Sequence, residues 1–148
     1  MSISEEEEAR RLAALLAGQP FQLLTYLSNQ LAVIKTQAQQ LIGLCGITIT
    51  VTGFSGAHMI KAGLVPSLLM VLGIALILVA AVMCLRTLTE TRWVTQDLDD
   101  ALEKTARAVI VRRNRLAHRL NIAGRFVALG LGAYLGAVAT AAVINAAT

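Results

Sequence analysis

The chain has 148 residues, of which 56% are hydrophobic and only 15% are charged, and its net charge is +4. A soluble domain of this length exposes more charge, so the composition argues against a soluble globular protein and favours an integral membrane protein. The length leaves too few residues for a second domain beside the apolar segments.

The first predicted element is an amphipathic helix within residues 1–18. Ser2 or Ser4 can cap it, and four glutamates, Glu5 to Glu8, fill a first turn in which the helix dipole favours negative charge. An apolar stripe of Leu12, Leu15 and Leu16 follows. Because the acidic end does not suit anionic lipid, we expect this helix to pack on other cytoplasmic helices.

Three stretches without Asp, Glu, Lys or Arg dominate the rest of the chain. They cover residues 36–60, 62–85 and 126–148, which are 25, 24 and 23 residues long. A bilayer core of roughly 30 Å needs about 20 helical residues, so each stretch is long enough to cross it. The sequence predicts an all-α integral membrane protein with three transmembrane helices and cytoplasmic helical extensions.

The element bounds follow from helix breakers and charge. Gly18 and Pro20 separate the first helix from a second one, and no further Gly or Pro occurs until Gly43. Residues 20–60 therefore read as a cytoplasmic arm that continues into the first span. The second span is expected at 64–85, facing lipid, and the third at 121–146. Between them lies a helical connector at 86–120, with a turn near residues 93–100.

The basic residues predict the orientation. Most Arg and Lys side chains lie in the connector, and basic loops stay in the cytoplasm. We therefore expect an integral membrane protein with a cytoplasmic N-terminus and an outside C-terminus. Anionic lipid headgroups are the expected contacts of one group of arginines. This group comprises Arg112, Arg113, Arg115 and Arg119. No aromatic residues interleave with them, so no nucleic-acid partner is expected.

Two spans carry seams of small residues, which let helix backbones approach closely in lipid. The seam of the first span consists of Gly43, Gly46, Thr50, Gly53 and Ala57. The seam of the third span consists of Ala128, Gly132, Gly136 and Thr140. We interpret both as helix contacts, within one subunit or between subunits, and we expect a homo-oligomer.

The first span is also the polar one. If it lines a pore, the candidate lining residues are Gln37, Gln40, Thr48, Thr52 and Ser55. The alternative is that the threonine hydroxyls bond to carbonyls of their own helix. No span holds an ionisable residue near its middle, which argues against a proton-coupled transporter or pump.

Catalysis has little support in the sequence. His58 and His118 are expected on opposite sides of the membrane, without a metal-ligand partner at useful spacing. Cys45 and Cys84 read as small buried residues. No nucleophile or phosphate-loop motif occurs, so we expect no enzyme, no metal and no cofactor.

The segment Lys35-Thr36-Gln37-Ala38-Gln39-Gln40-Leu41-Ile42-Gly43 resembles the entrance to the first span of Pycsar-effector-like and SLATT-type bacterial membrane proteins. In that family an acid stands at the position of Lys35 and a lysine at that of Gln37. The order of an amphipathic arm, a pair of spans and a charged connector is also similar. The resemblance implies a protein that oligomerises and permeabilises the inner membrane; no functional residue is carried over from it.

Two functions remain as hypotheses. The first is a homo-oligomeric pore or ion channel, with a membrane-permeabilising effector as one form of it. The second is a non-conducting accessory or scaffold subunit that docks a partner through its cytoplasmic helices.

Overall fold

The structure, a computed structural model, describes residues 4–16, 19–61, 63–89 and 102–147. Four helices account for nearly all of this part, which contains no strand. They are α1 (Glu5–Leu15), α2 (Pro20–Lys61), α3 (Leu64–Thr89) and α4 (Leu102–Ala147). The expected all-α class is confirmed.

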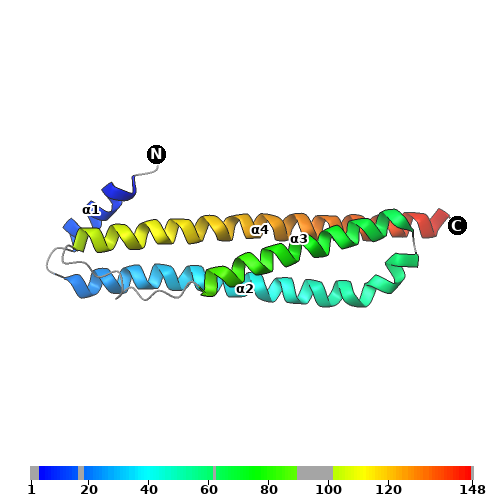
Figure 1. The fold of residues 1–148 in the computed structure, drawn as a ribbon, viewed down its shortest axis with the longest axis horizontal. Helices are drawn as coiled ribbons and strands as arrows, with labels where there is room; N and C mark the ends of the chain where they lie inside the picture. Colours follow the sequence, from blue (N-terminus) through cyan, green and yellow to red (C-terminus); the bar gives the residue numbers. More distant parts are fainter. Residues whose placement is uncertain (1–3, 17–18, 62, 90–101, 148) are drawn as a thin grey trace.

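The helices form a long, narrow bundle (Figure 1). α2 and α4 run in the same direction along the long axis, and α3 returns antiparallel to both, crossing them obliquely. α1 lies at the end of the bundle where α2 and α4 begin. With 42 and 46 residues, α2 and α4 are each more than 60 Å long at about 1.5 Å per residue. Each is about twice as long as a bilayer core is thick.

Local signals explain where the helices begin and end. The Ser4 hydroxyl accepts a hydrogen bond from the backbone N–H of Glu7 at 3.3 Å, as expected of a cap. α2 starts at Pro20 and continues without interruption to Lys61. Gly63 then adopts a φ of +126° between α2 and α3, a conformation that favours glycine. The turn expected at 93–100 lies outside the described residues.

Within the described residues two helices, not three, are long and apolar enough to cross a membrane. They are α3 over its 26 residues and α4 between Lys104 and Ala146. The expected first span is not among them. Three glutamines and three threonines dilute its apolar stretch between residues 37 and 52. The side chains of its far end, residue 55 and residues 57–61, are outside the described part.

The core follows a coiled-coil pattern. The buried positions of α3 are spaced alternately four and three residues apart, which is the repeat of helices that pack side by side. These positions are Pro66, Met70, Gly73, Ile77, Ala80, Cys84 and Thr87. The other faces of α3 expose large side chains such as Leu68, Val71 and Leu72. An apolar outer surface of this kind suits a lipid environment.

Candidate functional site

α3 and α4 meet backbone to backbone at two glycines. A Cβ added to Gly73 would lie 2.8 Å from the Gly130 carbonyl oxygen, and a Cβ added to Gly130 would lie 2.7 Å from Ile77 Cγ1. No side chain fits at either position without movement. Neither glycine belongs to a seam predicted from the sequence, and the predicted span that contains Gly73 was expected to face lipid. One face of α3 instead packs on α4.

The predicted seam of α2 faces outward. A Cβ added to Gly43, Gly46 or Gly53 would meet no atom within 4 Å, and Thr50 is exposed. The side chain of Ala57 lies outside the described part. The four described members of this seam therefore face away from the other described helices. Its role between subunits stays a prediction.

The predicted seam of α4 is divided. Ala128 and Gly132 are exposed, and the space above Gly132 is open. A Cβ on Gly136 would make ordinary contact with Leu69 at 3.8 Å. The Thr140 hydroxyl donates to the carbonyl oxygen of Gly136 at 2.8 Å, within its own helix. Within the described residues, Gly136 of this seam thus lies against another helix, at Leu69 of α3.

The threonines of α2 correct the pore-lining prediction. Thr48 and Thr52 are 7% and 1% exposed, so both lie inside the bundle. Their hydroxyls donate to the carbonyl oxygens of Leu44 and Thr48, at 2.8 and 2.6 Å. The alternative of bonding within the helix is therefore observed for both hydroxyls. Ser55 cannot be placed, because its side chain is outside the described residues.

Gln37 and Gln40 are exposed and line a groove between α2 and α4. The groove has a volume of about 490 Å³. Leu41 and Leu44 lie on the same wall of α2, and Asn121 and Gly124 of α4 line the opposite wall. Polar amides from two helices thus share one open recess at the start of the charge-free part of α2.

A polar network joins α1 to α4 and α2 through Arg113. The guanidinium of Arg113 donates to both carboxylate oxygens of Glu8, at 2.8 and 3.0 Å, and to Oε1 of Gln30 at 2.8 Å. The neighbouring Asn114 donates to Glu5 at 2.9 Å. The sequence assigned Arg113 to lipid headgroups. The structure corrects this, because the side chains of Arg113 and Glu8 are only 20% and 31% exposed.

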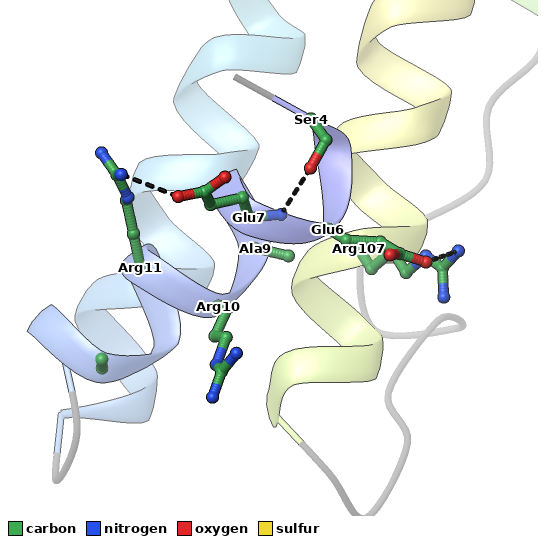
Figure 2. A pocket seen from close by; sticks show the side chains of 8 residues that line it. Ser4, Glu6, Glu7, Ala9, Arg10, Arg11 and Arg107 are labelled. Carbon is green, nitrogen blue, oxygen red and sulfur yellow. Dashed lines mark hydrogen bonds and ion pairs between the residues drawn. The ribbon is translucent and has the colours of Figure 1, made fainter.

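A hollow of about 720 Å³ lies between α1 and the start of α4. Figure 2 shows the side chains that line it. Both glutamates that line it are already paired, Glu7 with Arg11 at 2.8 Å and Glu6 with Arg107. Ala9, at the base of α1, is fully buried. The pair of Glu6 with Arg107 and the network of Arg113 hold α1 on α4, whereas the pair of Glu7 with Arg11 lies within α1. The hollow is a consequence of this docking, and its carboxylates are not free to bind a cation.

The other arginines assigned to headgroups lie along α4. Arg115 is exposed, while Arg112 and Arg119 are half-buried. Arg119 lines a hollow of about 390 Å³ together with Arg86, Thr89 and Met83 of α3. The described residues contain no group of His, Cys, Asp and Glu that could hold a metal ion. Cys45 and Cys84 are buried free thiols.

Comparison with protein-family models, with curated proteins and with solved structures finds no match for this chain. The resemblance of residues 35–43 to the Pycsar-effector-like and SLATT-type proteins therefore stays a prediction from the sequence.

Proposed function

We propose that the chain is a membrane protein that assembles with copies of itself into a passive pore, in the bacterial inner membrane. The charge-free half of α2 serves as the third span beside α3 and α4. The basic start of α4 lies in the cytoplasm with the N-terminus, and the C-terminus lies outside, in agreement with the positive-inside rule.

The observation that carries this proposal is the outward face of α2. Its small and polar residues are exposed and occupy about 100° of the helix circumference. They are Thr36, Gln39, Gly43, Gly46, Thr50 and Gly53. Large apolar side chains, among them Ile47 and Phe54, lie beside this face. A polar stripe gains nothing from lipid, whereas it suits another protein surface or water.

A second copy is the partner that fits this face. Gly73 and Gly130 show that this chain packs helices through glycine, and the outward glycines of α2 offer the same approach to a neighbour. A contact from this face of one copy to a different surface of the next is heterologous, and such contacts close into rings when the rotation permits.

An accessory or scaffold role is the second candidate. A groove of about 580 Å³ between α1 and α2 exposes apolar side chains far from the charge-free part of α2. Leu15 and Phe21 are each 80% exposed there. An apolar surface outside the membrane suits a protein partner, which a subunit of a larger complex would dock at this place.

The test is the mass of the particle in nanodiscs, followed by ion flux from liposomes that hold the same preparation. A defined homo-oligomer that releases ions supports the pore. A monomer contradicts self-assembly. A defined oligomer without flux contradicts the pore and favours the accessory role.

A further inference from the structure

The contact between α3 and α4 fixes the depth of Arg125 in the membrane. In the sequence Arg125 directly precedes the last charge-free stretch, so it reads as a residue of the cytoplasmic edge. Because Gly73 and Gly130 touch through their backbones, they lie at a common level. Positions on the two antiparallel helices can be compared by counting residues from this level.

Arg125 lies five residues from Gly130, or about 7.5 Å along α4. Arg119 lies eleven residues from Gly130, and Arg86 lies thirteen residues from Gly73, which correspond to about 16 and 20 Å. Arg86 and Arg119 line the same hollow, as this register requires. Arg125 is therefore about 9 Å deeper than the nearer of these two arginines.

The charge-free stretch 62–85 of α3 is centred on Gly73. A bilayer core about 30 Å thick and centred there reaches about 15 Å to either side. Arg86 and Arg119 then lie at its cytoplasmic boundary, and Arg125 lies inside it. When each charge-free stretch is considered alone, no span holds a charge near its middle. The offset between α3 and α4 changes this for Arg125.

Arg125 is exposed on α4, and the described residues give it neither an ion pair nor a hydrogen bond. The groove residue Asn121 precedes it by one helical turn. An arginine keeps its charge at any accessible pH. Charged residues at membrane depth face a protein interior or a water-filled cavity, and they mark ion pathways.

We propose that Arg125 faces the water-filled lumen of the pore and makes that pore select small anions over cations. This inference rests on the proposed pore. One guanidinium from each copy forms a ring of positive charge, which raises the local concentration of anions and repels cations. The aliphatic faces of α3 meanwhile remain toward lipid.

The experiment measures the reversal potential of the full chain in phosphatidylcholine bilayers across a tenfold KCl gradient. Phosphatidylcholine is zwitterionic and has no net charge, so surface charge is removed as a source of selectivity. We expect the wild type to reverse near the chloride equilibrium potential. Arg125→Gln is expected to move the reversal potential to about zero, while Arg125→Lys retains the anion preference. The matched control is Arg115→Gln, an exposed arginine of α4 outside the bilayer, which leaves selectivity unchanged.

A second variant covers the case in which Arg125→Gln does not assemble. Arg125→Cys is expected to lose selectivity and to regain it when a water-soluble cationic methanethiosulfonate restores the charge. The native Cys45 and Cys84 are buried, so the parent chain serves as the reagent control. Current with an unchanged reversal potential in Arg125→Gln would overturn the inference, because the guanidinium then reaches lipid headgroups. Absence of current in the wild type would refute the pore itself.

Discussion

The glycines of α3 and α4 differ from those of α2 in what lies against them. At Gly73 and Gly130 a neighbouring backbone fills the space where a Cβ would be. At Gly43, Gly46 and Gly53 that space is open. Glycines occur in both regions, so small residues alone do not tell whether a helix face is used inside the subunit or left for another molecule.

The largest expected effect comes from filling the closed crossing. Gly130→Leu places a side chain against Ile77 and the backbone of Gly73, so the helices must separate. We expect a loss of about 3 kcal/mol in the free energy of unfolding, the upper range for overpacking. Thermal unfolding in detergent measures it. Gly132→Leu, two residues away in open space, is the control. Equal destabilisation by both variants would contradict the crossing.

Filling the open face tests its use between copies. Gly46→Leu adds a side chain where the subunit has nothing within 4 Å, so we expect the subunit to fold normally. Assembly should be lost, which mass photometry of nanodiscs detects as a fall to monomer mass. Ile47→Leu changes the adjacent exposed position at constant volume and should keep the oligomer. An oligomer that survives in Gly46→Leu would show that another surface holds it.

Two ion pairs of α1 can be compared in the same way, one partly buried against α4 and one exposed within α1. Glu8→Gln removes the charge that pairs with the half-buried Arg113, at an expected cost of roughly 1–2 kcal/mol to α1 docking. Faster tryptic cleavage after Arg10 and Arg11 reports this loss. Glu7→Gln breaks only the exposed pair with Arg11 inside α1 and should leave cleavage unchanged. Identical rates in both variants would argue against the role of Arg113.

The smallest effect is expected inside the bundle. Thr52→Val removes a hydroxyl that donates to the Thr48 carbonyl oxygen at 2.6 Å, so the free energy of unfolding should change by less than about 1 kcal/mol. Ion flux from liposomes should not change, because Thr52 is buried. Thr50→Val alters the outward face and is expected to change the flux. A flux that responds to Thr52→Val alone would restore the original lining prediction.

The sequence predicts what depends on neighbours along the chain. The cap at Ser4, the start of a second helix at Pro20, and the unbroken course of that helix are all confirmed. These features arise within one or two turns of helix, where propensity and capping decide the outcome. Long apolar stretches likewise predict α3 and the second half of α4 as candidate spans.

The sequence does not predict which faces meet, because that depends on the register between helices. In the sequence, Gly73 interrupts the aliphatic stretch at 64–85. The alternating spacing of small and apolar residues in 66–87 is the signal that could have identified its face as packed. Arg113 gave no such signal, since its partner Glu8 lies 105 residues earlier in the chain.

This long separation has a consequence for biosynthesis. α1 leaves the ribosome first, yet the arginine that holds it is translated only after α2 and α3 have been made. The carboxylates of Glu5, Glu6 and Glu8 therefore have no α4 partners until that helix has been made. Docking of α1 thus requires that translation has passed Arg113, with α2 and α3 already made.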